Sequence, residues 1–164
     1  RFKEYKIKDG DLSKLKMRMD IIPVSVALAQ AANESGWGTS RFALEGNALF
    51  GQWTWSKKGI SPKNQDPDKT HKILQFQVLK ASVRAYKNNL NTHNAYKEFR
   101  EARAQLRQEG AEIMGLELTK YLSNYASIGV KYVEILENII VRNSLTDFDK
   151  ANLLPTKLKT GVAL

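Results

Sequence analysis

One glutamate stands at the end of a segment that is otherwise almost wholly apolar. Residues 21–32 contain few polar side chains, Asn33 and Glu34 follow them, and residues 35–38 read Ser-Gly-Trp-Gly. Glutamate is seldom buried without a partner, because its charged form loses its hydration. A carboxyl held in such a place keeps its proton toward neutral pH. Glu34 is therefore a candidate general acid.

Two effects predict a raised pKa for Glu34. Burial beside apolar groups disfavours the ionised form, and the negative end of a helix dipole adds about 0.3–1 kcal/mol against a carboxylate. Desolvation is expected to be the larger effect. On a helix Glu34 shares a face with Ala27, Gln30 and Ala31. The small alanines leave room for a ligand, and Gln30 supplies an amide that can bind it.

A protonated carboxyl beside aromatic rings suits the cleavage of a glycosidic bond. The leaving oxygen needs a proton, and sugar rings stack on flat apolar surfaces. The aromatic residues available for such stacking are Trp37, Phe50, Trp53, Trp55 and Tyr125. Core packing is the competing interpretation of the tryptophans and of Phe50. For Glu34 the competing interpretation is a position at a helix end, with its side chain turned to solvent.

The elements that would hold these residues are mostly helical. Apolar spacing predicts a short helix over about residues 11–20 and a buried helix over about 23–35. Pro23 suits the first turn of the second helix, and Gly36 suits its end. Four later helices are predicted around residues 83–90, 96–106, 116–122 and 133–140.

A different pattern occupies residues 38–80. Trp53 and Trp55 alternate with polar residues, residues 73–76 form a second possible strand, and residues 57–68 are rich in loop formers. We expect a small irregular β-hairpin lobe with a long loop. The sequence thus predicts one mostly helical domain with a β insertion directly after the Glu34 helix.

Composition narrows the function classes. The chain has 164 residues, enough for one domain, and no cysteine, which excludes disulfides and a cysteine nucleophile. The two histidines, His71 and His93, have no metal-ligand spacing, so we expect neither a metal nor a cofactor. No apolar run reaches the ~20 residues of a membrane span. The start at Arg1 suggests a processed fragment from which a signal peptide or anchor was removed.

The chain carries a net charge of +9. Such an excess favours polyanionic partners: nucleic acid, anionic lipid or wall polymers. The basic residues are scattered, as on a solvated surface, and no recognition-helix pattern is evident. We therefore expect no nucleic-acid partner.

Longer motifs resemble a known enzyme family. Residues 27–41, ALAQAANESGWGTSR, followed after a fixed interval by Asn-Ala-Leu-Phe-Gly at 47–51, closely resemble glycoside hydrolase family 73, the bacterial endo-β-N-acetylglucosaminidases that cut peptidoglycan. Residues 51–53, 90–96 and 125–133 look like the Bax-type branch of that family. The resemblance covers about residues 20–142.

The resemblance implies a lysozyme-like α+β fold, mainly α, in a single domain. We place that domain at residues 1–147, its β-lobe at about 51–78 and a tail at 148–164. The predicted catalytic residues are Glu34, which would be the general acid, and Tyr125, which would line the cleft opposite it. Together with the chemistry above, the resemblance predicts these substrate-binding residues: Gln30, Trp37, Asn47, Phe50, Gly51, Gln52, Trp53 and Tyr132.

The implied reaction is hydrolysis of the GlcNAc-β-1,4-MurNAc bond of peptidoglycan glycan strands. We expect a monomer that acts in the periplasm, the cell envelope or outside the cell. Cleavage on the muramyl side, by a muramidase or lytic transglycosylase, is an alternative. A catalytically silent wall-binding module is another, and a nucleic-acid binder has only charge and helix content in its favour.

One departure concerns the second catalytic group. Many family members carry another glutamate in the β-lobe, but residues 69–72 read Lys-Thr-His-Lys here. Asp66 and Asp68 are the nearest candidates, and Glu45 precedes the lobe. A second carboxylate that activates water would stand ~6.5–9.5 Å from the acid and give inversion. Alternatively, the N-acetyl group of the substrate acts as the nucleophile.

Overall fold

The computed structural model describes residues 1–55, 59–62 and 70–152. Its α-helices are α1 (Leu12–Arg18), α2 (Val24–Ser35), α3 (Arg41–Gly46), α4 (Leu79–Thr92), α5 (Lys97–Gln108), α6 (Gly115–Leu118) and α7 (Val130–Arg142). Short 3₁₀ segments are η1 (Asn94–Tyr96), η2 (Thr119–Tyr125) and η3 (Leu145–Lys150). The strands are β1 (Trp53–Thr54), β2 (Gly59–Ile60) and β3 (Lys72–Leu74). The predicted α+β fold, mainly α, is confirmed.

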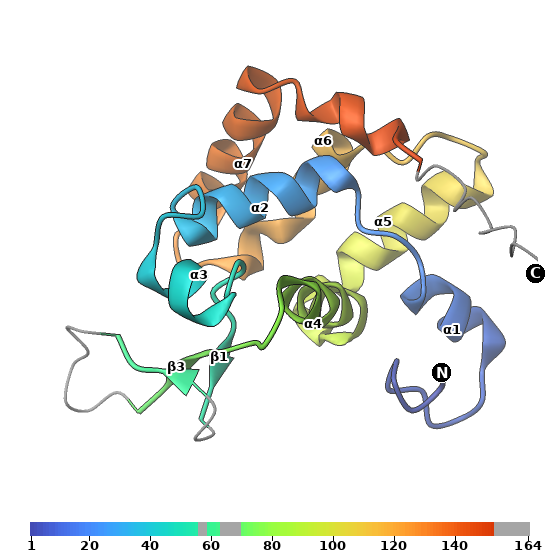
Figure 1. The fold of residues 1–164 in the computed structure, drawn as a ribbon. Helices are drawn as coiled ribbons and strands as arrows, with labels where there is room; N and C mark the ends of the chain where they lie inside the picture. Colours follow the sequence, from blue (N-terminus) through green and yellow to red (C-terminus); the bar gives the residue numbers. More distant parts are fainter. Residues whose placement is uncertain (56–58, 63–69, 153–164) are drawn as a thin grey trace, which may run out of the picture.

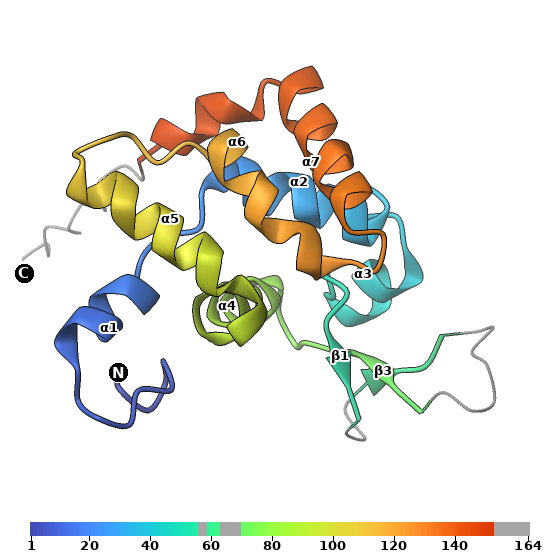
Figure 2. The same ribbon diagram turned by 180° about the vertical axis from the view of Figure 1, so that it is seen from behind.

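The helices gather in one body, and the small sheet projects from it beside α3 and the start of α4 (Figures 1 and 2). The two views agree that α1 lies on the other side of α4 from the sheet. Among the described residues no helix combines the length and apolar character that crossing a bilayer requires.

Helix α2 carries Glu34 and follows the predicted bounds closely. Pro23 precedes its first residue, and Gly36 ends it with a φ of +57°, which glycine adopts without strain. Val26, Ala29 and Gln30 are fully buried, and the helix packs on α6, α7 and η3. The predicted buried helix is buried on one face only, because Val24 and Leu28 are exposed on the opposite face.

The β-lobe is a three-stranded antiparallel sheet in the order β1-β3-β2. Trp53 pairs with Ile73 on one side, and Ile60 pairs with the same residue on the other. The sequence predicted two strands and missed β2, because Gly59 and Ile60 lie in the segment 57–68, which is rich in loop formers. Asp66 and Asp68 lie outside the described residues.

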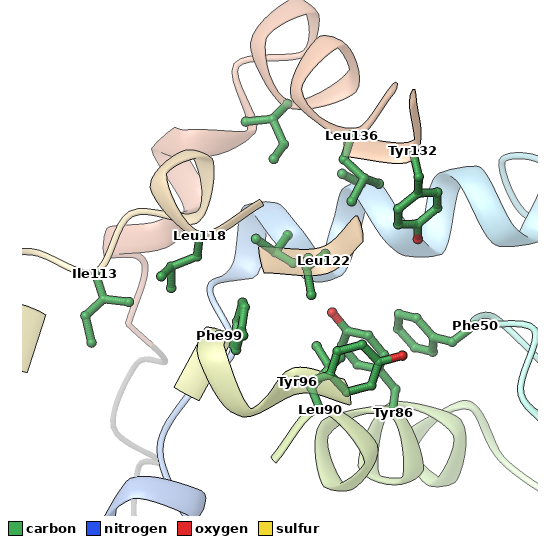
Figure 3. Close-up of a cluster of buried hydrophobic side chains, with 13 residues drawn as sticks. Phe50, Tyr86, Leu90, Tyr96, Phe99, Ile113, Leu118, Leu122, Tyr132 and Leu136 are labelled. Atoms are coloured by element: carbon green, nitrogen blue, oxygen red, sulfur yellow. The ribbon is translucent and has the colours of Figure 1, made fainter. Parts of the chain in front are cut away.

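An aromatic and aliphatic core joins α2, α4, α5 and α7 (Figure 3). Phe50 is buried in it, with its ring stacked on Tyr86 at a centroid distance of 3.9 Å. For Phe50, core packing is therefore correct. Trp53 and Trp55 are instead exposed by 62% and 73%, so neither tryptophan belongs to the core.

Two arginines of α5 are buried with the core. The guanidinium of Arg103 donates to the carbonyls of Met17 and Ile21, and to Oδ1 of Asn91 at 2.9 Å. Arg100 donates to the carbonyls of Leu90 and His93 at 2.9 and 2.8 Å. Met17 and Leu90 lie in the last turns of α1 and α4, and Ile21 and His93 follow those two helices. The arginines thus fix the entry to α2 and the end of α4.

The start of α2 is capped from the far end of the chain. Pro23 has no side-chain acceptor, and Asp149 of η3 takes that role: it accepts from Ser25 N at 2.8 Å and Ser25 Oγ at 2.7 Å. The same carboxyl accepts from Gly115 N at 2.8 Å. Asp149 belongs to the predicted tail, residues 148–164. Residues 153–164 lie outside the described part.

Asp149→Ala is expected to lower the free energy of unfolding by about 1–3 kcal/mol, because it removes a helix cap and leaves part-buried donors without an acceptor. Urea unfolding followed by circular dichroism measures the change. Asp147→Ala is the matched control, since Asp147 is exposed on the same segment. Equal stability of the two variants would contradict the capping role.

Candidate active site

Glu34 lies in the last turn of α2, half-buried at the wall of a cleft of about 420 Å³. The other walls come from residues 50–53, from Asn89 on α4 and Tyr96 at the end of η1, and from residues 125–127 at the end of η2. A hollow of 440 Å³ lies elsewhere, between the N-terminal segment and α4. The volume of a hollow therefore does not identify the site. We identify it by the carboxyl of Glu34 in the cleft wall.

The two oxygens of Glu34 have different surroundings. Oε1 accepts from the hydroxyl of Tyr132 at 2.9 Å and from Nδ2 of Asn33 at 3.3 Å. Oε2 lies over Gly51, where an added Cβ would come within 3.2 Å of it. Burial raises the pKa of Glu34, and the hydrogen bonds from Tyr132 and Asn33 oppose that rise only in part. The direction is the one predicted from the sequence.

Three tyrosines stand against this carboxyl. The ring of Tyr125 lies parallel to that of Tyr132 at 5.5 Å and tilted to that of Tyr96 at 5.9 Å. The hydroxyl of Tyr125 donates to the carbonyl of Phe50 at 3.0 Å. Burial, and secondarily the charge of Glu34, raises the pKa of both Tyr125 and Tyr132. All of these phenols are neutral at physiological pH, so they act as hydrogen-bonding groups and not as bases.

Comparison with known proteins assigns the family. The model of the family described as Glucosaminidase, mannosyl-glycoprotein endo-beta-N-acetylglucosaminidase, matches residues 11–145. The chain belongs to this glucosaminidase family. It is also 40% identical over 136 residues to Protein bax of Escherichia coli (strain K12), a match that covers 79% of this chain and 48% of that protein. The chain thus spans about half the length of this curated relative. No solved structure matches it significantly.

Within this glucosaminidase domain, five of the predicted site residues line the cleft beside Glu34: Phe50, Gly51, Gln52, Trp53 and Tyr125. Trp53 stands at the exposed edge, stacked on His71 at 4.3 Å, and presents an aromatic surface to a ligand. Gln52 is half-buried, and its Oε1 is a buried atom that has no hydrogen-bond partner among the described residues. Such an atom is an available acceptor for a sugar donor after a small side-chain rotation.

The remaining predicted residues that the structure describes do not line the cleft. Gln30 is fully buried beneath Glu34, and its amide is bound by the hydroxyls of Tyr86 and Tyr132. Asn47 ends α3 at a φ of +49° and donates to the carbonyl of Phe76 at 3.0 Å, so it fixes the start of the lobe. Trp37 is 65% exposed just beyond α2.

No second carboxylate lines the cleft in the ranges 1–55, 59–62 and 70–152. Glu45 is turned to solvent on α3, with its carboxylate 3.5 Å from Arg41. The lobe candidates Asp66 and Asp68 fall in the range outside the described residues. The second group therefore stays an open prediction.

Sequence reasoning missed Asn89 and Tyr96 as cleft residues. Tyr96 belongs to the segment 90–96 that carries the family resemblance, which was a usable signal, but its apolar spacing suggested a core role. Both roles are correct, because Tyr96 is only 6% exposed and still borders the cleft. Asn89 had no signal of its own beyond a polar side chain on an amphipathic helix.

Gly51→Ala is expected to lower kcat/KM by roughly 10- to 100-fold, because the new methyl group presses on the Glu34 oxygen that faces the cleft. The φ of +58° at this position adds a stability loss of about 1–2 kcal/mol. Gly110→Ala is the control, since Gly110 has a φ of +68° and open space around it. It should show a comparable stability loss with unchanged kinetics. Equal kinetics of both variants would contradict the close approach.

Proposed function

We propose that this protein hydrolyses the GlcNAc-β-1,4-MurNAc bond of peptidoglycan, with Glu34 as the general acid. The observation that carries the proposal is the environment of Glu34: a half-buried carboxyl with a raised pKa at the wall of an aromatic cleft. An acid of this kind keeps its proton at a pH where an exposed glutamate has lost it. It can then protonate the oxygen of a leaving sugar.

The arrangement of the cleft supports this chemistry. Oε2 of Glu34 faces the cleft above Gly51, so the proton donor and the scissile oxygen would meet there. Trp53 gives a flat surface for a sugar ring at the cleft edge, and the amides of Gln52 and Asn89 are placed to bind hydroxyl or acetamido groups. Family membership supports an N-acetylglucosaminyl substrate.

Two routes complete the displacement at the anomeric carbon. In the first, Asp66 or Asp68 acts as a base for an attacking water molecule. In the second, the acetamido oxygen of the substrate attacks, the bond to the leaving oxygen breaks as Glu34 supplies its proton, and water then opens the cyclic intermediate. The anomeric configuration of the first product, followed by NMR, separates the routes, since inversion supports the first and retention the second.

The net charge of +9 supports a wall polymer as the partner, since peptidoglycan and its associated polymers carry negative charge. With this substrate the protein would act as a monomer in the periplasm, in the cell envelope or outside the cell.

Digestion of purified sacculi tests the proposal. Products reduced with borohydride and analysed by mass spectrometry should end in reduced N-acetylglucosamine. Muramitol ends would instead identify a muramidase, and anhydromuramyl ends a lytic transglycosylase. Tight binding to sacculi without released fragments would identify a silent wall-binding module. Full release of fragments by the Glu34→Gln variant would refute the role of Glu34 in every enzymatic version.

A further inference from the structure

A chain of buried hydrogen bonds runs from α4 through α2 and α7 to Glu34. The hydroxyl of Tyr86 lies 2.7 Å from Oε1 of Gln30, Nε2 of Gln30 lies 2.9 Å from the hydroxyl oxygen of Tyr132, and that hydroxyl lies 2.9 Å from Oε1 of Glu34. Tyr86, Gln30 and Tyr132 are each at most 1% exposed. Solvent therefore offers these groups no alternative partners.

The chemistry of the amide gives this chain one direction. Nε2 of Gln30 can only donate, so the oxygen of Tyr132 accepts from it and the hydrogen of Tyr132 is left for Glu34. Oε1 of Gln30 can only accept, so Tyr86 donates to it. The reversed amide would place a donor against Tyr86 and turn the hydrogen of Tyr132 away from the carboxyl. Only the first arrangement satisfies every buried group.

The direction of these hydrogen bonds decides which oxygen of the Glu34 carboxyl can hold a proton. Oε1 of Glu34 accepts from Tyr132 and from Asn33, so a hydrogen on Oε1 would face two donors. Oε2 accepts from no donor within residues 1–55, 59–62 and 70–152, and it lies over Gly51 at the cleft wall. The neutral acid therefore carries its hydrogen on the oxygen that a leaving group can reach.

We propose that Tyr86 and Gln30 are positioning residues: they orient the hydroxyl of Tyr132 so that Glu34 carries its acidic proton on Oε2, toward the substrate. Neither residue lines the cleft, and each acts through Tyr132. The catalytic consequence rests on the proposed function of Glu34 as general acid, whereas the hydrogen-bond direction can be tested without activity.

The groups that face Glu34 allow the pKa of its carboxyl to be measured separately. They are Tyr132 on α7, Tyr125 on η2, Tyr96 on η1, the amide of Asn33 on α2 and the backbone of Gly51. The phenols have raised pKa values and stay neutral while the carboxyl titrates. Glu34 should therefore titrate in one step, which carboxyl-labelled glutamate reports by carbon-13 NMR.

Tyr86→Phe tests the direction of these hydrogen bonds, because Tyr86 is three hydrogen bonds away from Glu34. The phenylalanine keeps the ring stacked on Phe50 but removes the donor to Gln30, so the amide can turn over and draw the hydrogen of Tyr132 to itself. The ionised carboxylate of Glu34 then loses the hydrogen bond that the hydroxyl of Tyr132 donates to it. We expect a higher pKa of Glu34, an alkaline limb of kcat at higher pH, and a kcat about tenfold lower with little change in KM.

A double-mutant cycle separates this effect from general damage. Tyr132→Phe should raise the pKa of Glu34 by itself, and Tyr86→Phe added to it should produce no further change, because the link between them is gone. Tyr121→Phe is the matched control on η2 and should leave both the pKa of Glu34 and kcat unchanged.

The results separate this proposal from the proposed function. An unchanged or lowered pKa of Glu34 in Tyr86→Phe or in Tyr132→Phe would overturn the positioning role, as would equal shifts from Tyr86→Phe in both backgrounds. Loss of activity in Glu34→Gln would still uphold the general acid in that case. Conversely, an active Glu34→Gln variant would refute the proposed function and leave the NMR cycle valid.

Discussion

Glu34→Gln is expected to slow glycan cleavage by about 10²–10⁴-fold, the usual contribution of a general acid. Glutamine keeps the shape of the side chain, and its carbonyl oxygen can still accept from Tyr132. What it lacks is an acidic proton for the leaving oxygen. Release of reducing ends from purified sacculi, compared at equal enzyme concentration, measures the loss.

Glu45→Gln is the matched control for this substitution. Glu45 lies on α3, its side chain is 59% exposed, and it does not border the cleft. We expect it to cleave at the parental rate. A similar loss in both variants would indicate a general effect of lowered negative charge and would contradict the assignment to Glu34.

Glu34→Gln should also stabilise the folded protein at neutral pH. The folded state raises the pKa of Glu34 above its ordinary value of 4.5, so the folded protein binds this proton more tightly than the unfolded chain does. Stability therefore falls as pH rises through the window between 4.5 and the raised pKa. Glu34→Gln should show a higher Tm above that window and no difference below it. A lower Tm at pH 7 would contradict the burial of this carboxyl.

Arg103→Met is expected to lower the free energy of unfolding by about 3–5 kcal/mol. The guanidinium is fully buried, and it satisfies the carbonyls of Met17 and Ile21. Methionine fills part of the volume but leaves these acceptors and Asn91 without a donor. Burial lowers the pKa of Arg103 to about 10, which still leaves it charged at neutral pH. Urea unfolding at pH 7 measures the loss.

Arg107→Met provides the comparison. Arg107 lies one helical turn later, is half exposed, and pairs with Asp20 at 3.0 Å. The pair is bidentate, and its Asp20 side is only 19% exposed, so we expect it to contribute about 1 kcal/mol. Both substitutions remove one positive charge from α5, so only burial and hydrogen bonding differ between them. Equal losses would show that the carbonyls bound by Arg103 contribute nothing specific.

The helix that carries Glu34 could be predicted from the sequence for local reasons. Pro23 and Gly36 mark its ends through backbone conformation, and the apolar run marks it as a packed helix. The lobe was predicted less completely. Its central strand β3 pairs on both sides, and the two-residue partner β2 has no periodicity to detect.

The surroundings of Glu34 depend on contacts between distant residues, which no local pattern encodes. Spacing placed Gln30 on the same helix face as Glu34, and that is correct. It could not show that Tyr86 and Tyr132, at separations of 56 and 102 residues, cover the amide and remove it from the ligand surface. Tyr125 and Tyr132 entered the prediction through family resemblance, because their distance along the chain hides their proximity to the carboxyl.

The cap that Asp149 gives to α2 bears on the order of events during biosynthesis. Ser25 and its partner are 124 positions apart, so the nascent chain makes the beginning of this helix long before the residue that secures it. Asp149 must emerge from the ribosome before the start of the helix has this acceptor. A shorter nascent chain therefore holds Glu34 on a helix whose first turn lacks this cap.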